Sequence, residues 1–277
     1  QLFQQHVGDL VANLGFDFVN GAENSLEPLR KLLEEYKDDF TPNLRVEWDD
    51  HSLDTVLDGL ALESKWTFNI PSLARRVEGI SGGHLVVVGA RPNTGKTSFH
   101  ASLVAAENGF AAQGAKCIIL CNEESYKRVA SRYISASSLM TVKEALQNKA
   151  LANKRYYPVS KNIQFKDSTG KGMDWVESVV KYEKPDIVIL DMGDKFADIR
   201  SERTDITLKA AAIHARNISK QYDCAVIWMS QLSAEAEGRA DLNQAMMEGS
   251  KTGKAAEADL MILIGKTQQV EGRMKIP

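Results

Sequence analysis

The sequence has few cysteines, no long hydrophobic run and little net charge. Its three cysteines are Cys117, Cys121 and Cys224, and each lies in or at the start of an apolar run. This placement predicts buried, reduced thiols in a cytoplasmic protein, and no Cys or His cluster has zinc-ligand spacing. No apolar run approaches the roughly 18 residues of a membrane span. The net charge of −3 argues against a globally basic nucleic-acid binder, so contacts with nucleic acid would have to come from local loops.

A phosphate-binding loop is the clearest motif that is present. The stretch from Ala90 to Thr97 fits the G-x-x-x-x-G-K-[ST] pattern, with Ala90 in place of the first glycine. We expect Lys96 to reach the β and γ phosphates of ATP, or of another nucleoside triphosphate, and the Thr97 hydroxyl to bind Mg²⁺. Backbone N–H groups and the positive end of the following helix would hold the phosphates. The residues predicted to bind nucleotide are Ala90, Arg91, Pro92, Asn93, Thr94, Gly95, Lys96, Thr97 and Ser98.

Apolar strands alternate with helical patterns on both sides of this loop. Continuous Val, Ile and Leu runs of this kind predict an α/β fold with a mostly parallel sheet and helices on both faces. Ligands of such sheets bind at the carboxyl ends of the strands. The predicted strands are 84–90, 116–122, 163–166, 186–191, 224–230 and 259–265, and the helices are 98–113, 125–138, 173–183 and 205–221.

Polar residues follow several of these strands at the edge where the nucleotide is expected. Glu123 is the predicted base for the attacking water, and Glu124 is the alternative. Asp191 ends a run of four apolar residues about 95 residues after Lys96, which predicts a Mg²⁺ ligand, and Asp194 is the alternative. Gln231 is the predicted sensor of the γ-phosphate.

Two long polar segments follow the strands that end near Asp191 and Gln231. They cover residues 193–204 and 232–258, and loops this long inside a domain are usually functional. Glycine, lysine and small residues suit a phosphate backbone, whereas the lack of aromatic residues argues against base stacking. A plain surface loop is the alternative interpretation. The predicted nucleic-acid-binding residues are Arg239, Gly249, Ser250, Lys251, Thr252, Gly253 and Lys254.

The first 65 residues show helical periodicity and no recognisable chemistry. Helices are predicted over 2–14, 25–40 and 51–62, which suits a small packing or oligomerisation segment. Residues 66–83 are punctuated by proline and glycine and are predicted to be a linker. Residues 84–277 would form the nucleotide-hydrolysing motor domain, which we expect to be incomplete at its C-terminus.

These motifs, in this order and spacing, resemble the RecA-like motor domain of DnaB-type replicative helicases and the helicase part of bacteriophage primase-helicases. The more specific features are the Ala-Arg-Pro form of the phosphate loop and the Ser-Gln-Leu that follows a strand. The matching stretches are Gly89-Ala90-Arg91-Pro92, Gly95-Lys96-Thr97, Glu123-Glu124-Ser125, residues 187–191, Met229-Ser230-Gln231-Leu232 and Ala258-Asp259-Leu260-Met261.

The resemblance implies a RecA-like P-loop core and a ring of identical subunits, usually a hexamer. It implies ATP hydrolysis between neighbours, 5′→3′ movement on single-stranded DNA, and work beside primase or other replication proteins in a bacterial cell or phage-infected host. The loop around Gly249 to Lys254 would face the DNA. The family's arginine finger is not assigned to any residue of this sequence. A RecA-type recombinase, and a nucleotide-gated scaffold or loader that does not unwind DNA, remain alternatives.

Overall fold

The computed structural model describes residues 12, 19, 52–61, 65–77, 79–197, 204–249 and 253–266. The chain divides into two units, residues 1–55 and 56–277. The helices predicted over 2–14 and 25–40 lie outside the described residues, apart from Ala12. The third predicted helix is present as α3 (Leu53–Ala61), slightly shorter than expected.

A six-stranded parallel sheet forms the centre of the second unit, and its order is β5-β4-β6-β7-β3-β8. The register sets the ends of neighbouring strands level: Ala90 pairs with Gln231, and Cys121 pairs with Asp191. The observed bounds of each strand agree with the predicted bounds to within about one residue. The strands are β3 (Leu85–Ala90), β4 (Cys117–Cys121), β5 (Ile163–Asp167), β6 (Ile187–Asp191), β7 (Ala225–Gln231) and β8 (Leu260–Ile264).

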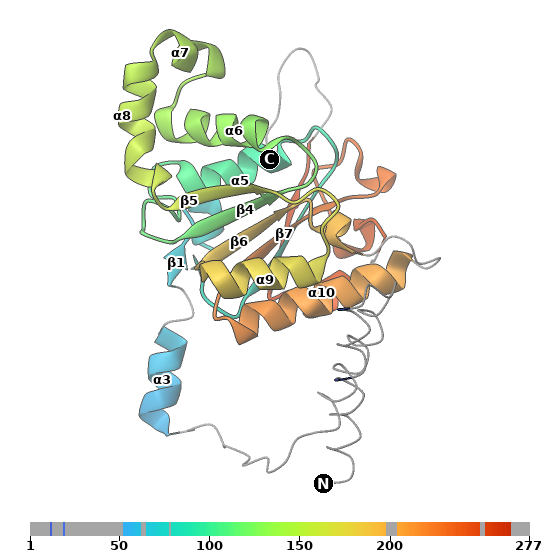
Figure 1. Ribbon diagram of the computed structural model, residues 1–277. Helices are drawn as coiled ribbons and strands as arrows, with labels where there is room; N and C mark the ends of the chain where they lie inside the picture. The colour runs from blue at the N-terminus through green and yellow to red at the C-terminus, as the bar shows by residue number, and fades with distance from the viewer. Residues whose placement is uncertain are drawn as a thin grey trace, which may run out of the picture. The chain divides into compact units, whose positions relative to one another are not determined.

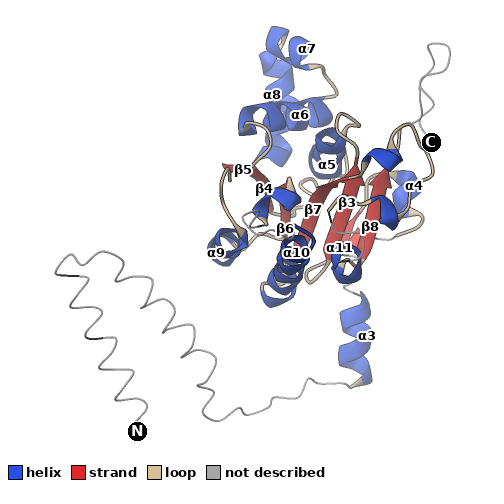
Figure 2. Cartoon of the chain, turned by 90° about the vertical axis from the view of Figure 1, so that its right-hand side faces the viewer, coloured by secondary structure: helices blue, strands red, loops and turns tan. Residues whose placement is uncertain are grey.

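Helices cover both faces of this sheet, as Figures 1 and 2 show. Successive side chains of β3 point to opposite faces, so Val86 and Val88 join one apolar cluster while Leu85 and Val87 join the other. On the first face lie α5 (Lys96–Ala105), α6 (Tyr126–Ser138) and α8 (Lys149–Ser160), with α7 (Val142–Gln147) against α6 and α8. The second face carries α9 (Met173–Glu183), α10 (Thr204–Gln221) and α11 (Gly253–Glu257).

The helix after the phosphate loop is shorter than the sequence predicts. The pattern predicts a helix over 98–113, whereas α5 ends at Ala105. Asn108 has a left-handed φ of 56°, and a Cβ on Gly109 would lie 2.6 Å from the Val104 carbonyl oxygen, so the chain turns tightly here instead of continuing the helix.

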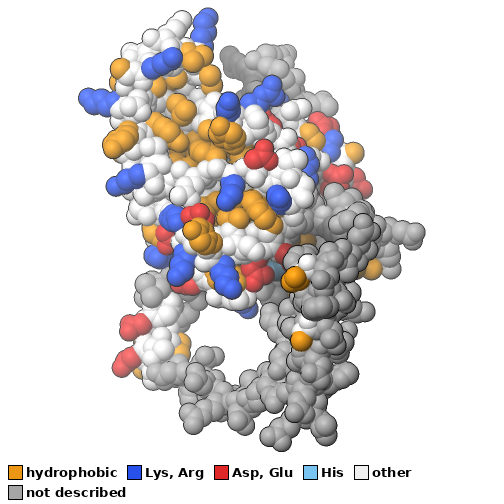
Figure 3. All heavy atoms as spheres, viewed as in Figure 1, with side chains coloured by type: hydrophobic (Ala, Val, Ile, Leu, Met, Phe, Trp, Pro, Cys, Tyr) orange, Lys and Arg blue, Asp and Glu red, His pale blue; other side chains and the backbone are white. Residues whose placement is uncertain are grey.

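Helices α7 and α8 have no counterpart among the predicted elements. A capping box starts α7: the Thr141 hydroxyl accepts a hydrogen bond from the Glu144 N–H, and the Glu144 carboxylate accepts one from the Thr141 N–H. The Thr-x-x-Glu spacing was readable in the sequence as a helix start. Apolar side chains of α6, α7 and α8 line a groove of about 320 Å³, and Figure 3 shows hydrophobic side chains exposed around it.

The predicted linker over 66–83 is packed in the structure rather than extended. It contains β1 (Trp66–Thr67), α4 (Pro71–Ala74) and β2 (Gly79–Ile80), with β1 and β2 antiparallel. Trp66, Phe68 and Ile80 are buried in the first apolar cluster. Burial of these apolar residues explains why the segment differs from a linker, which would leave them in water.

The three cysteines are buried free thiols, in agreement with the sequence prediction. Burial, together with nearby carboxylates, raises the pKa of both Cys121 and Cys224 to about 12, so these thiols stay protonated at neutral pH. Over the described part of the chain, no helix combines the length and apolar character needed to span a membrane.

Candidate nucleotide-binding and catalytic site

The phosphate loop joins β3 to α5 and leaves the start of α5 open. Asn93 and Gly95 have left-handed φ values of 60° and 94°, which bend the chain around the helix start. A Cβ at Gly95 would meet no atom within 4 Å, so glycine serves the backbone conformation there rather than a close approach. No side chain caps α5, so the N–H groups of its first turn lack a side-chain acceptor. An uncapped helix start of this kind suits an anion.

Lys96 projects from α5 to the ends of the neighbouring strands. Its Nζ lies 2.9 Å from the Met192 Sδ and 4.0 Å from the Glu123 carboxylate. The Gln231 amide nitrogen approaches the same sulfur at 3.7 Å. Burial lowers the pKa of Lys96, and the charges of Glu123 and Asp191 oppose that shift only in part. The structure thus brings Lys96 and Gln231 to Met192, a residue that is not among the sequence predictions, and brings Glu123 to Lys96.

Glu123 and Glu124 differ in how their carboxylates are occupied. Glu124 accepts hydrogen bonds from both terminal nitrogens of the Arg132 guanidinium, at 3.0 and 3.1 Å. Glu123 makes only the long 4.0 Å approach to Lys96 among the ion pairs of the described residues, and about a third of its side chain is exposed. Glu123 therefore has the freer carboxylate, as a base for water requires.

Asp191 ends β6 as a buried carboxylate with one free oxygen. His100 Nε2 lies 3.2 Å from Oδ2, whereas Oδ1 is buried without a hydrogen-bond partner. Burial raises the pKa of Asp191, but His100, Lys96 and Arg132 outweigh that effect, and the net pKa is lowered. An ionised carboxylate oxygen without a donor is what a metal-bound water would meet.

A Mg²⁺ ion fits this arrangement better than a metal held by protein ligands alone. The described residues contain no group of three or more His, Cys, Asp or Glu side chains that could enclose a metal. Mg²⁺ needs fewer protein ligands, because it keeps several waters and binds substrate phosphates. Asp191 and Thr97 remain the predicted ligands, and Thr97 is half-buried in the first turn of α5.

Asp194, the alternative metal ligand, is fully occupied. Its Oδ1 accepts from the Trp228 indole at 2.9 Å and from Lys254 Nζ at 2.9 Å. Its Oδ2 accepts from the Ser230 hydroxyl at 2.7 Å and from the Gln231 backbone N–H at 3.2 Å. Both carboxylate oxygens are saturated, so Asp194 has no lone pair to offer a metal without losing an internal bond.

The predicted contact between Lys254 and nucleic acid does not agree with the structure. Its side chain is fully buried, and its ammonium donates to Asp194, to Ser230 and to the Glu248 carbonyl. All three ammonium hydrogens are used inside the protein, so this lysine cannot contact a DNA phosphate in this conformation. The sequence prediction relied on the charge of Lys254 and could not foresee its buried partner.

The other predicted nucleic-acid residues are divided between surface, interior and undescribed chain. Arg239 is exposed after β7, and Gly253 is buried at the start of α11. Gly249 has a left-handed φ of 75°, and a Cβ there would lie 2.5 Å from Leu208. Ser250, Lys251 and Thr252 lie outside the described residues.

The first residues of the phosphate loop line a cavity beside the segment that follows β7. Arg91 donates to the Glu237 carboxylate and to the Leu232 carbonyl, which ties the loop to the segment after β7. Arg91, Pro92, Asn93 and Thr94 line one wall of a cavity of about 360 Å³, and Glu237 lies across it. Ser98 is exposed in the first turn of α5.

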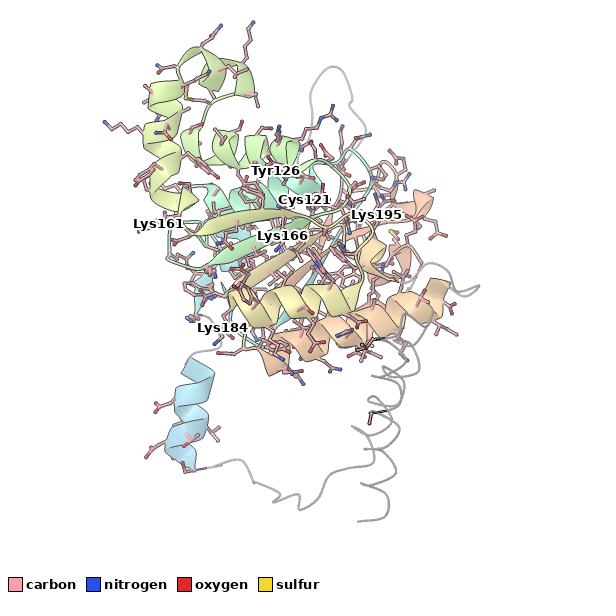
Figure 4. All side chains as sticks on the ribbon, viewed as in Figure 1. Cys121, Tyr126, Lys161, Lys166, Lys184 and Lys195 are labelled. Atoms are coloured by element: carbon pink, nitrogen blue, oxygen red, sulfur yellow. The ribbon has the colours of Figure 1, made fainter. Side chains whose placement is uncertain are left out.

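All these groups lie at one edge of the sheet. Figure 4 shows Cys121, which ends β4, and Lys195, which follows β6, toward that edge, with Lys161 and Lys184 toward the opposite one. The carboxyl ends of β3, β4, β6 and β7 are thus level with one another at the edge where the sequence predicts the site.

Comparison with known proteins agrees with this geometry. The family described as the DnaB-like helicase C-terminal domain matches residues 67–275. The chain belongs to the DnaB-like helicase family. That family comprises NTP-hydrolysing helicases. The motifs of this sequence already indicate a resemblance to it. No curated protein matches the sequence.

Two solved structures share the fold. One, of a helicase ATPase domain, superposes with a TM-score of 0.65 at 20% identity, covering 78% of this chain and 84% of that one. The other, a DnaB-like replicative helicase studied for its interactions with primase, superposes with a TM-score of 0.69 at 17% identity. That match covers 94% of this chain, which spans 64% of the other chain's length. These similarities show a RecA-like α/β fold, as predicted.

Proposed function

We propose that this protein is the ATP-hydrolysing motor of a replicative DNA helicase. The observation that carries the proposal is the convergence on the uncapped start of α5. Lys96 is the first residue of that helix, and Glu123, Asp191 and Gln231 approach it from the ends of β4, β6 and β7. A cation, a free carboxylate, a carboxylate with an open oxygen and a neutral amide are the groups that phosphoryl transfer to water uses.

Each residue of this set has a distinct task in the proposal. Residues 90–98 bind the triphosphate of ATP, and Lys96 balances its charge. Glu123 orients and deprotonates the attacking water, and Gln231 senses the γ-phosphate. Thr97 and Asp191 hold Mg²⁺, which neutralises charge on the phosphates when it is bound.

The proposed assembly is a homo-oligomeric ring, a hexamer in line with the family, that moves 5′→3′ on single-stranded DNA in the cytoplasm. Val142 and Leu146 are exposed apolar residues that line the α6–α8 groove, and they suit a protein contact. Arg239, Gly249 and the segment 250–253 are the proposed DNA contacts, and Lys254 supports them from the interior. Primase is a proposed partner, because one related helicase was studied with it.

The first test measures ATP hydrolysis with and without single-stranded DNA on the purified chain. Lys96→Ala should abolish hydrolysis, because the variant loses the cation beside the phosphates. Glu123→Gln should still bind nucleotide and hydrolyse it about 10²–10⁴-fold more slowly. Lys161→Ala is the matched control, since Lys161 is an exposed lysine at the opposite edge of the sheet.

Near-normal hydrolysis by Lys96→Ala would reject the site. A strand-exchange assay beside an unwinding assay distinguishes the helicase from a recombinase. Nucleotide-dependent oligomers with no DNA-stimulated hydrolysis would instead indicate a scaffold or loader.

A further inference from the structure

A buried histidine lies directly behind the proposed Mg²⁺ ligand. His100 follows Lys96 by four residues on α5, so both side chains lie on the same face of the helix. His100 has no exposed surface, and its Nε2 lies 3.2 Å from Asp191 Oδ2. A fully buried histidine beside a strand-end carboxylate costs solvation, so its contacts need an explanation.

The second ring nitrogen of His100 makes the hydrogen bond that holds the ring. Its Nδ1 lies 2.8 Å from the Tyr133 hydroxyl of α6. Tyr133 is itself buried, and its ring packs edge-on against Phe165 of β5, with centroids 4.9 Å apart. Tyr133 is thereby fixed between α6 and the sheet, and it fixes the plane and position of the imidazole.

The hydrogen-bonding capacities of the three groups select one arrangement. His100 Nε2 makes no aligned hydrogen bond, and its contact with Asp191 is the 3.2 Å approach to Oδ2. The carboxylate can only accept, so a proton on Nε2 faces Oδ2 favourably. Nδ1 of the neutral ring then has a lone pair, to which the Tyr133 hydroxyl donates. This arrangement places Nε2 beside Oδ2 and leaves Oδ1, which is buried without a partner, facing away from the histidine contact.

We infer that His100, held by Tyr133, is a positioning residue that orients Asp191 for metal binding. The inference rests on the proposed function, because it assumes that Asp191 helps hold Mg²⁺. His100 touches neither nucleotide nor reacting atoms in this scheme. Its effect is to fix the carboxylate so that Oδ1 faces the metal-bound water, which is how groups behind metal ligands usually act.

The test uses Mn²⁺ as the probe and electron paramagnetic resonance as the readout. Mn²⁺ affinity is measured with a non-hydrolysable ATP analogue bound, and analogue affinity is measured separately in EDTA. His100→Leu should weaken Mn²⁺ binding about 10–100-fold, the range for losing a group behind a metal ligand. Analogue binding in EDTA should change by less than about twofold, because the phosphate loop is intact.

Two further variants separate positioning from packing. Tyr133→Phe keeps the ring and removes only the hydroxyl, so it should weaken Mn²⁺ binding in the same direction but less. His100→Gln keeps an N–H donor and should recover part of the affinity. His214→Leu is the matched control, because His214 bonds Glu177 on the other face of the sheet and is not in contact with Asp191.

The outcomes separate the inference from the function that it assumes. Unchanged Mn²⁺ affinity in folded His100→Leu, or in Tyr133→Phe if the first variant does not fold, overturns the inference alone. Failure of the unsubstituted protein to bind Mn²⁺ with the analogue overturns the proposed function, and the inference with it. Equal losses in the metal-bound and metal-free measurements would also overturn the inference, because they would indicate general damage to the site.

Discussion

Two aspartates three residues apart, Asp191 and Asp194, have opposite surroundings. Asp191 keeps one oxygen free inside the protein, and its only close cationic or polar side-chain contact on the other oxygen, among the described residues, is His100. Asp194 accepts four hydrogen bonds, one of them from a fully buried lysine. The first carboxylate is available for a ligand, whereas the second holds the protein together.

The difference shows that two carboxylates at the end of one strand can have separate tasks, one structural and one in ligand binding. Asp194 joins the start of η1 (Gly193–Phe196), the end of β7 and the helix α11 through its four donors. This internal ion pair fixes the backbone of Gln231 while its side chain stays beside Lys96 and Met192. A rigid support of this kind lets the neighbouring carboxylate keep one oxygen without a donor, since a buried polar atom that lacks a partner is otherwise costly.

The largest expected effect is on hydrolysis in Asp191→Asn. Loss of the carboxylate charge should slow Mg²⁺-dependent ATP hydrolysis about a thousandfold or more, because metal-held charge stabilisation is worth several kcal/mol. Unfolding in urea should change less than in the Asp194 variant below, since Oδ1 has no internal partner to lose and only the His100 contact on Oδ2 is weakened. A variant that unfolds readily but hydrolyses ATP normally would reverse the roles of the two aspartates.

The next effect is on stability in Asp194→Asn. The buried Lys254 ammonium would lose its counter-charge, which should cost about 3 kcal/mol of unfolding free energy in urea titrations. We expect the lower end of the usual range because 17% of the Asp194 side chain is exposed. The double variant Asp194→Asn with Lys254→Met should lose less than the sum of the single variants. Strict additivity would mean that the pair is not coupled.

The smallest effect is expected in Glu124→Gln. Its partner Arg132 is about one-third exposed, and such ion pairs contribute less than about 1 kcal/mol. Urea unfolding and ATP hydrolysis should both stay close to those of the unsubstituted protein, in contrast with Glu123→Gln. If Glu124→Gln stops hydrolysis and Glu123→Gln does not, the base has been assigned to the wrong carboxylate.

The sequence predicts the sheet well because its strands are continuous apolar runs and its phosphate loop has a fixed pattern. The same reasoning places Lys96, Glu123, Asp191 and Gln231 at one edge, and the structure brings Lys96 and Gln231 to Met192 and Glu123 to Lys96. The sequence does not reveal which of several charged side chains near this edge form ion pairs with one another. Lys254 resembles any loop lysine until the fold places Asp194 beside it.

His100 is a further example of this limit. A histidine in a helix is uninformative by itself, and only its spacing of four residues from Lys96 indicates a shared face. Its partners come from β6 and α6, which are distant in sequence. Pairings of this kind depend on tertiary contacts, which a local pattern does not encode.

Trp228 gives the protein an optical reporter of its own. The indole is fully buried and bonded to Asp194, and a Cβ on Gly193 would lie only 2.5 Å from its ring. A ring held this closely should fluoresce at short wavelength and respond in intensity when Asp194 or its neighbours shift. Rapid mixing with nucleotide could therefore follow events beside Gln231 in real time, with no label attached to the chain.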